Sequence, residues 1–227
     1  PLYAHQQTAV AAMVAWERAP VCTAARCNAA TKMSVRCGFY CDPVAAGKTV
    51  TVLAMALQRP PPEVPAYRVI QSNALGRVET ASRVYRDGYA RRAATLVVVP
   101  HSLFRHWKQT VRAFVRPDRW AGVRFVQFKR DFARSADGAW LVIVSSTRWR
   151  EYGERHTERR VWDRIVFDEA DSLHIAKNPE VQARFYWFVT ATPERWNLRS
   201  SGFLRDAHYQ LSFLAHNPAP MTPKARA

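Results

Sequence analysis

Runs of hydrophobic residues alternate along the chain with segments that have helical spacing or few helix-breaking residues. The runs predict buried strands, and they lie at 35–41, 94–100, 123–128, 140–146, 162–170 and 185–193. Helices are predicted at 2–16, 48–57 and 101–115, and a further helix is expected around 180–183. This alternation predicts an α/β fold with a doubly wound, mostly parallel sheet and helices on both faces.

The segment CDPVAAGKTV, residues 41–50, lies between a predicted strand and a predicted helix. It ends in Gly47-Lys48-Thr49, which closes the phosphate-binding pattern G-x-x-x-x-G-K-[ST], but Asp42 stands where that pattern opens with glycine. The triplet alone would occur by chance in roughly one chain of this length in ten. A strand, a loop and a helix in this order are the context that a phosphate-binding loop requires. Because the triplet can still occur by chance, a second motif is needed to decide the interpretation.

A second informative stretch, RIVFDEADSLH at 164–174, follows a hydrophobic strand with the acidic tetrapeptide 168–171. Strands that end in acids deliver carboxylates to the crevice where nucleotides bind in open α/β sheets. Asp168 at such a place can hold magnesium, and Glu169 can polarise water. The alternative is a solvated turn or a helix N-terminus favoured by the helix dipole.

The formal net charge of +16 is typical of a protein that works near phosphate backbones. Lysine occurs only at positions 32, 48, 108, 129, 177 and 224, so arginine dominates the 34 basic residues, and GC-rich coding is an alternative reason for the charge. The sequence has neither an uninterrupted apolar run of about 18 residues nor a signal peptide. We therefore expect a soluble, intracellular protein without a membrane partner, and the start at Pro1 suggests a trimmed fragment.

Five segments follow the order and approximate spacing of motifs in a known family. They are LYAHQQTAV (2–10), AAGKTVTVLA (45–54), LVVVPHSLFRHWKQ (96–109), WDRIVFDEAD (162–171) and FVTATP (188–193). Over nearly its whole length the chain resembles the first RecA-like domain of superfamily 2 helicases and translocases. It is most similar to Swi/Snf-type and viral DEAD/DEAH helicase-like ATPases. The residues that flank the tetrapeptide 168–171 resemble the Swi/Snf type, and in the nucleotide-binding loop of these ATPases an Asp is common at the position of Asp42.

The resemblance implies ATP and magnesium as cofactors and gives each motif a role. Gln6 resembles the glutamine that recognises adenine, although a surface glutamine on a helix is the alternative. The implied nucleotide-binding residues are Gln6, Ala45, Ala46, Gly47, Lys48, Thr49 and Val50. Lys48, Asp168 and Glu169 are the implied catalytic residues, with Thr49 and Asp168 as magnesium ligands. Thr190, Ala191 and Thr192 resemble the motif that couples hydrolysis to domain movement, and a strand end with capping hydroxyls is the alternative.

Nucleic acid, DNA in preference to RNA, is the implied partner. The candidate contacts with its phosphates are Pro100, His101, Ser102, Ser146, Thr147 and Arg148. Three tryptophans are candidate platforms for stacked bases, although aromatic residues at such spacing belong more often to the core. They are Trp107, Trp149 and Trp187.

The four cysteines of the chain lie within twenty residues of one another. They are Cys22, Cys27, Cys37 and Cys41, at spacings C-x4-C-x9-C-x3-C. Four thiolates could hold a structural zinc ion, but the spacing lacks paired C-x2-C motifs, so we favour thiols without metal. Metal analysis of the purified protein would decide between these interpretations.

Together these features predict one RecA-like ATP-binding lobe at 1–215, with insertions at about 20–36 and 60–93 and a polar tail at 216–227. A second RecA-like lobe, which supplies the arginine finger in such motors, is expected outside this chain. The leading hypothesis is therefore an ATP hydrolase of the helicase or translocase type that is weak or inactive as an isolated lobe. The alternative is a degenerate module that binds nucleic acid or a protein partner without turnover.

Overall fold

The computed structural model describes most of the predicted lobe. The described residues are 1–18, 21–23, 32–34, 37–58, 60–61, 67–72, 78–83, 90–133, 137–156, 160–173 and 182–193. At 21–23, 32–34, 67–72, 78–83, 156 and 182 the description covers the backbone only. In this part of the chain every helix is too short or too polar to traverse a bilayer.

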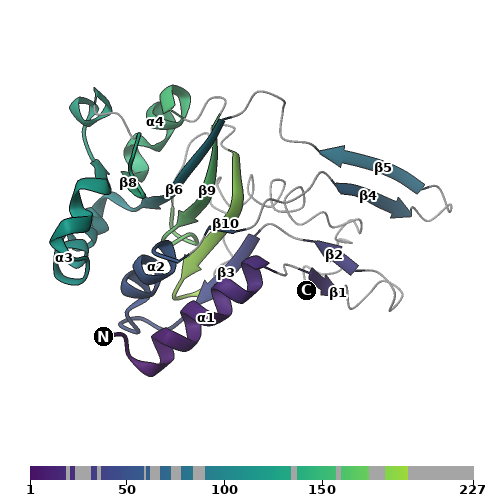
Figure 1. Ribbon diagram of the computed structural model, residues 1–227, viewed down its shortest axis with the longest axis horizontal. Helices are drawn as coiled ribbons and strands as arrows, with labels where there is room; N and C mark the ends of the chain where they lie inside the picture. The colour runs from purple at the N-terminus through teal and green to yellow at the C-terminus, as the bar shows by residue number, and fades with distance from the viewer. Residues whose placement is uncertain are drawn as a thin grey trace.

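One parallel sheet forms the centre of the described structure (Figure 1). Its strand order is β3-β10-β9-β6-β8-β7, and each neighbouring pair runs parallel. The strands are β3 (Cys37–Cys41), β6 (Ala90–Val99), β7 (Val123–Val126), β8 (Leu141–Ser145), β9 (Arg160–Phe167) and β10 (Gln182–Thr190). This sheet confirms the predicted α/β fold class.

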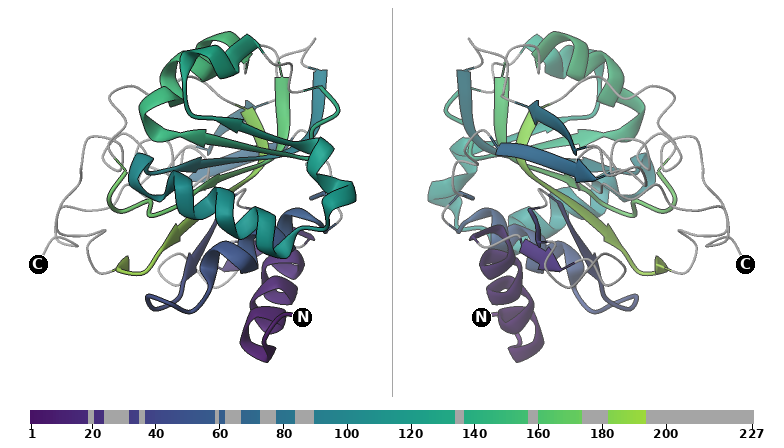
Figure 2. Two further views of the ribbon diagram at one scale, coloured as in Figure 1. Left: turned by 90° about the vertical axis from the view of Figure 1, so that its left-hand side faces the viewer. Right: turned by 90° about the vertical axis from the view of Figure 1, so that its right-hand side faces the viewer.

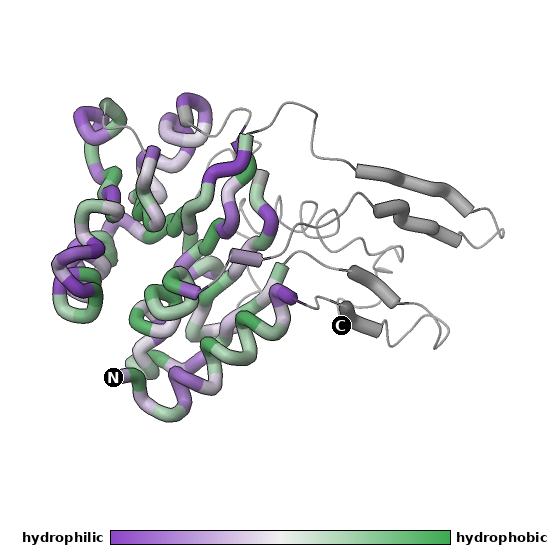
Figure 3. The backbone as a smooth tube through the Cα atoms, viewed as in Figure 1, coloured by the Kyte–Doolittle hydropathy of each residue, from purple (hydrophilic) through white to green (hydrophobic). Residues whose placement is uncertain are grey.

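Helices cover both faces of the sheet, as Figure 2 shows: α1, α2 and α3 lie on one side and α4 on the other. Their bounds are α1 (Ala4–Arg18), α2 (Lys48–Ala56), α3 (Phe104–Phe114) and α4 (Trp149–His156). Short 3-10 helices lie between the larger elements: η1 (His101–Leu103), η2 (Pro117–Gly122), η3 (Lys129–Ala133) and η4 (Ser146–Arg148). Because parallel strands with helices on both faces are buried on both sides, they are rich in hydrophobic residues, with hydrophilic positions among them (Figure 3).

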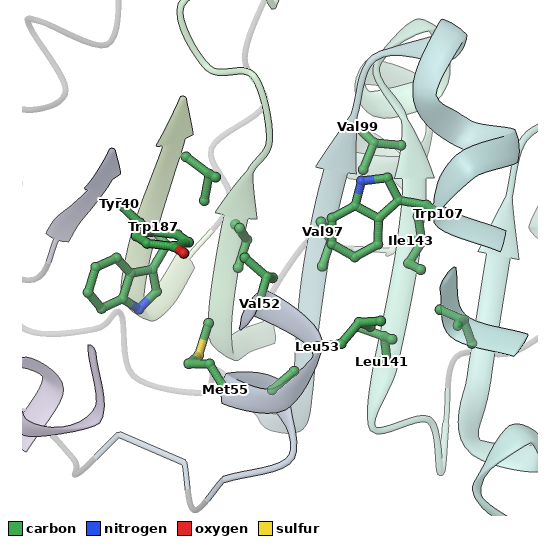
Figure 4. Packing of buried hydrophobic residues seen from close by; sticks show 14 of the residues in the cluster. Tyr40, Val52, Leu53, Met55, Val97, Val99, Trp107, Leu141, Ile143 and Trp187 are labelled. Atoms are coloured by element: carbon green, nitrogen blue, oxygen red, sulfur yellow. The ribbon is translucent and has the colours of Figure 1, made fainter. Parts of the chain in front are cut away.

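Successive residues of each strand pack into two hydrophobic clusters, one on each face. Val97 and Val99 of β6 join α2 and α3 in one cluster, where Trp107 is fully buried (Figure 4). Leu96 and Val98 belong to the other cluster. The strand therefore contributes to both cores, which fixes its register against the helices.

A buried ion pair fastens α1 to the sheet. Arg164 of β9 donates to both carboxylate oxygens of Glu17, at 2.6 and 2.7 Å, and both side chains are at most 2% exposed. The indole Nε1 of Trp187 in β10 donates to the same carboxylate at 2.8 Å. Gly38 makes room for this indole, because a Cβ on Gly38 would come within 2.4 Å of the ring.

Three local expectations differ from the structure. Gln182 and Ala183 lie in β10, so the helix predicted around 180–183 is wrong there, and residues 180 and 181 lie outside the described residues. Strand pairing with Val161 and Trp162 of β9 determines their conformation instead. Helix α4 was not predicted, and β6 begins at Ala90, before the predicted strand start.

The described parts of the two predicted insertions each contain a small antiparallel sheet. Strands β1 (Val21–Thr23) and β2 (Lys32–Ser34) pair in the first insertion, and β4 (Tyr67–Ser72) and β5 (Val78–Arg83) pair in the second. Both pairs are separate from the six-stranded sheet. The boundaries predicted for the lobe and its tail stay a prediction.

Candidate functional site

The loop between β3 and α2 presents backbone N–H groups at the start of a helix. Ala45 and Gly47 have positive φ angles of 66° and 78°, and Gly47 is the N-cap of α2 without a side-chain cap. The helix begins at Lys48, and Val50 N and Thr51 N both donate to Gly47 O. Since the first amides of a helix attract anions, this loop has the backbone of a phosphate site.

The N-terminal end of α1 lies against this loop. Gln6 is 5% exposed, and its Oε1 accepts from Tyr3 N at 3.0 Å. Its Nε2 faces Gly47, because a Cβ on Gly47 would come within 2.3 Å of that atom. His5 Nε2 also lies 3.1 Å from Ala46 O. Gln6 is therefore not a surface glutamine, and the structure brings it to the loop as the motif order predicts.

Asp42 ties the loop to the end of β3. Tyr40 OH donates to Asp42 Oδ2 at 2.6 Å, and burial, reinforced by Asp42, raises the pKa of Tyr40 to about 12. Lys48 Nζ donates to the carbonyl oxygens of Asp42 and Pro43, at 3.0 and 3.1 Å. Asp42 directly follows the strand, before the positive-φ residues, so the loop tolerates a side chain at this position.

Ala45 is strained, because an alanine pays about 1–2 kcal/mol in the left-handed conformation. We expect Ala45→Gly to raise the free energy of unfolding by about 0.5–1 kcal/mol, since the flexibility of glycine in the unfolded chain offsets part of the relief. Thermal unfolding measures this change. Ala46→Gly is the matched control, because Ala46 has no positive φ and should gain nothing. An equal increase in the free energy of unfolding in both variants would show that the backbone of Ala45 is not strained.

The acids that follow β9 lie at the carboxyl edge of the sheet. Asp168 N donates to Val98 O of β6, and Ala170 N donates to Val189 O of β10, both at 2.9 Å. The Asp168 carboxylate is buried and accepts a hydrogen bond from Trp107 Nε1 at 2.7 Å. Glu169 has a φ of 47° and is half-buried, so a strained backbone holds its carboxylate at this edge.

The charge of Lys48 links the loop to these acids. Burial raises the pKa of Asp168 to about 6, and the Trp107 hydrogen bond opposes this rise. Burial also raises the pKa of Glu169. The Lys48 ammonium lowers both pKa values. Strands β3, β10 and β9 are neighbours in the parallel sheet, so the loop after β3 and the acids after β9 lie at the same edge. The loop and the acid pair therefore form one site.

The raised pKa of Asp168 predicts a pH dependence of stability. Between pH 4 and 6 the unfolded chain has lost this proton, while the folded chain retains it, so stability falls as pH rises, by up to about 1.4 kcal/mol per pH unit. We expect Asp168→Asn to reduce this fall and to leave only the part that comes from Glu169, whose pKa is also raised, as measured by urea unfolding in EDTA. Asp118→Asn, at an exposed carboxylate, controls for the lost charge. A wild-type slope that survives in Asp168→Asn would contradict the assignment.

Asp171 joins the acidic loop to the end of β10. Its carboxylate accepts hydrogen bonds from Thr190 Oγ1 and from Thr192 Oγ1, the latter at 2.7 Å. Thr192 N also donates to Thr190 Oγ1 at 3.0 Å. No role was predicted for Asp171 from the sequence, although its place in the tetrapeptide was a signal. The two threonines, with Ala191 between them, are thus connected directly to the segment that carries Asp168 and Glu169.

The two candidate nucleic-acid segments also meet at the carboxyl edge. Residues 100–102 follow β6 and residues 146–148 follow the neighbouring strand β8. His101 Nδ1 lies 3.1 Å from Ser145 Oγ, which lies 3.0 Å from Thr147 Oγ1. His101, Ser102 and Thr147 are exposed. Arg148 forms an ion pair with Glu151 at 3.5 Å.

The three candidate stacking tryptophans are core residues. Trp107 and Trp149 have no exposed surface, and Trp187 is 3% exposed. Trp149 packs edge-on against Phe167, with ring centroids 5.9 Å apart. Since a base cannot stack on a ring that the protein already covers, these residues are not stacking platforms, and the favoured interpretation as core residues is confirmed.

The residues at this edge fit magnesium that binds together with a nucleotide. Within the described residues no three His, Cys, Asp or Glu side chains are grouped to hold a metal ion. Magnesium usually takes only one or two protein side chains and completes its shell with phosphates and water, so Thr49 and Asp168 suffice. The zinc hypothesis lies partly outside the described residues, because Cys27 and the side chain of Cys22 do; Cys37 is buried and Cys41 exposed.

Known proteins share this sequence and fold. Over 179 residues the chain is 27% identical to "DNA repair protein RAD5B" from Arabidopsis thaliana, a match that covers 72% of this chain and 14% of that protein. The solved structure "Sulfolobus solfataricus SWI2/SNF2 ATPase core in complex with dsDNA" has a similar fold, with a TM-score of 0.55 at 16% identity. It matches 100% of this chain, which spans 38% of that chain.

The family comparison agrees with the motif order and with the geometry of the edge. Residues 5–201 match the SNF2-related domain family, a range that contains the loop, the acids and the threonines. This family corresponds to the Swi/Snf-type part of the predicted resemblance. The chain therefore belongs to the SNF2-related domain family.

Proposed function

We propose that this chain is the ATP-binding lobe of an ATP-dependent translocase that couples ATP hydrolysis to movement on nucleic acid, DNA in preference to RNA. The observation that carries the proposal is the shared edge of the sheet: Lys48 begins α2 after β3, the acids Asp168 and Glu169 follow β9, and the strand between these two, β10, pairs with both. A phosphate-binding helix start, a lysine and an acid pair are the parts that phosphoryl transfer to water requires.

Each residue of the edge has a role in this proposal. Gln6 recognises adenine beside Gly47, and the amides of 45–50 receive the phosphates. Lys48 turns from the loop carbonyls to the β and γ phosphates. Thr49 and Asp168 hold magnesium, which neutralises charge on the phosphates. Glu169, whose pKa burial raises, orients the attacking water.

Asp171 connects this chemistry to movement. Its carboxylate holds Thr190 and Thr192 in hydrogen bonds, so a shift of the acidic loop would move the end of β10. His101, Ser102 and Thr147 are exposed at the same edge and offer hydroxyl and imidazole groups to a phosphate backbone. Contacts of this kind position a strand without reading bases, so little sequence specificity is expected.

The second lobe and the preference for DNA are also part of the proposal. The chain spans only 14% of its Arabidopsis relative and 38% of the Sulfolobus ATPase core. That ATPase core was solved in complex with double-stranded DNA, which supports a DNA duplex as the partner here. An arginine finger from a second lobe typically accelerates hydrolysis by about 10³–10⁵-fold, so this lobe alone should hydrolyse ATP slowly.

The test is ATP hydrolysis by the full-length protein, with magnesium, in the presence and absence of duplex DNA. Stimulation by DNA, and displacement of a triplex-forming strand during hydrolysis, would support translocation. Strand separation without triplex displacement would replace translocation by unwinding. An ATP hydrolysis rate that neither DNA nor RNA changes would contradict the proposal.

One observation favours the second candidate, a binding module without turnover. Ala45 carries a Cβ at a φ of 66°, where the phosphate loop would be more relaxed with glycine. Titration of a fluorescent ATP analogue with magnesium separates the two functions. Absence of magnesium-dependent nucleotide binding by the full-length protein would favour the binding module.

A further inference from the structure

The indole of Trp107 reaches from α3 to the acid at the end of β9. Its Nε1 donates to Asp168 Oδ2 at 2.7 Å, which is the short end of the range for a charge-assisted bond. Trp107 has no exposed surface and Asp168 is 4% exposed. Water therefore has little access to this bond, which joins residues 61 positions apart in the sequence.

The surroundings of the ring leave it little freedom to rotate. Trp107 packs in the cluster that contains Val97, Val99 and Ile143 (Figure 4). Val99 is the last residue of β6, and Asp168 N donates to Val98 O of the same strand. The donor and the backbone of Asp168 are thus both fixed relative to β6. The packing of the indole therefore sets the direction of the hydrogen bond.

This bond differs from those of most tryptophans in the described residues. Trp16, Trp120 and Trp140 donate their indole N–H groups to backbone carbonyls. Trp107 donates to a carboxylate, and Trp187 does so as well, to Glu17. An indole offers one donor and no acceptor, so it can orient a carboxylate without competing for a cation.

We propose that Trp107 is a positioning residue for magnesium binding: its indole N–H occupies one carboxylate oxygen of Asp168 and so fixes the plane in which the other faces the metal site. The inference rests on the proposed function, in which Asp168 is a magnesium ligand. Groups that orient metal ligands typically contribute about 10–100-fold to metal affinity. The phenyl ring of Trp107→Phe keeps part of the packing and removes the donor.

The experiment measures binding of a fluorescent ATP analogue to the full-length protein as MgCl₂ is titrated. Trp107→Phe should raise the magnesium concentration at half-saturation by about 10–100-fold, while nucleotide affinity at saturating magnesium stays close to the wild-type value. The hydrolysis rate should show the same shift in magnesium dependence and recover at high magnesium. A residue that only supports the fold would lower binding at every magnesium concentration.

Trp187→Phe is the matched control, because it removes the other buried indole N–H that donates to a carboxylate. It should lower the melting temperature but leave the half-saturating magnesium concentration unchanged. If Trp107→Phe does not fold, 3-benzothienylalanine at position 107 replaces the N–H by sulfur and keeps the ring shape. This replacement should produce the same shift.

The outcomes distinguish the inference from the function on which it rests. Wild-type protein that shows no magnesium-dependent nucleotide binding would overturn the proposed function, and the inference with it. If wild-type protein binds the nucleotide in a magnesium-dependent way, and the position-107 variants give the same binding curve against magnesium concentration, only the role of Trp107 is overturned. An equal shift of the half-saturating magnesium concentration in Trp187→Phe would also overturn the positioning role of Trp107 and leave it a role in core packing only.

Discussion

Lys48→Ala is expected to lower ATP hydrolysis by the full-length protein at least about 100-fold, the cost of removing one preorganised positive group from a reacting phosphate. The Lys48 ammonium sits at the first residue of α2, and its charge lowers the pKa values of Asp168 and Glu169. Its loss therefore removes a phosphate contact and also makes both acids harder to ionise. Steady-state hydrolysis at saturating ATP and magnesium measures the effect.

Nucleotide affinity should fall as well, by about 10–100-fold, because a charge-assisted hydrogen bond contributes about 1.5–3 kcal/mol. Lys129→Ala is the control: Lys129 is exposed and pairs with Glu151, away from the loop. Hydrolysis by Lys129→Ala should match the wild type. If Lys48→Ala also hydrolyses ATP at the wild-type rate, the loop has no part in the mechanism.

Glu17→Ala is expected to destabilise the fold by about 3–5 kcal/mol, the usual cost of removing one partner from a buried ion pair. The variant deprives the guanidinium of Arg164 of its bidentate carboxylate and removes the acceptor of Trp187 Nε1. For a domain of this size the melting temperature should fall by roughly 6–20 °C. Thermal and urea unfolding both measure the change.

Glu151→Ala provides the matched control, because Glu151 forms solvent-accessible ion pairs with Lys129 and Arg148, and pairs of this kind contribute little to stability. The double variant Glu17→Leu with Arg164→Met should recover most of the loss, since it leaves no buried charge behind. A melting temperature of Glu17→Ala close to that of Glu151→Ala would show that the pair contributes little.

The strands were predictable because burial on both faces makes most residues of each strand hydrophobic. Val97, Val98 and Val99 alternate between the two clusters, and no polar residue interrupts them. The wrong helix at 182–183 reflects a tertiary contact, since pairing with β9 determines the conformation of these residues. Helix α4 was missed because WREYGERH is mostly polar and contains Gly153, so its buried Trp149 and Tyr152 form too short a pattern.

For the candidate site, the residues of each local motif could be predicted from the sequence, but the contacts between side chains of different motifs could not. The strand, loop and helix around Gly47-Lys48-Thr49 were predicted from local residues, and the structure has β3, the loop and the start of α2 in this order. The acceptor role of Asp171 depends on Thr190 and Thr192, which lie on another strand. The bond from Trp107 to Asp168 likewise exists only because the sheet places β6 next to β9. The sequence contains these residues but no local signal that pairs them.

The position of β3 at the edge of the six-stranded sheet has a consequence for synthesis of the chain. Among the described residues β3 pairs only with β10, and Cys37 faces Tyr186 in that pairing. The partner strand thus leaves the ribosome about 150 residues after β3, and contacts so distant in sequence form slowly. Until β10 emerges, both edges of β3 lack their partner in this sheet, which makes the nascent chain prone to aggregate in this interval.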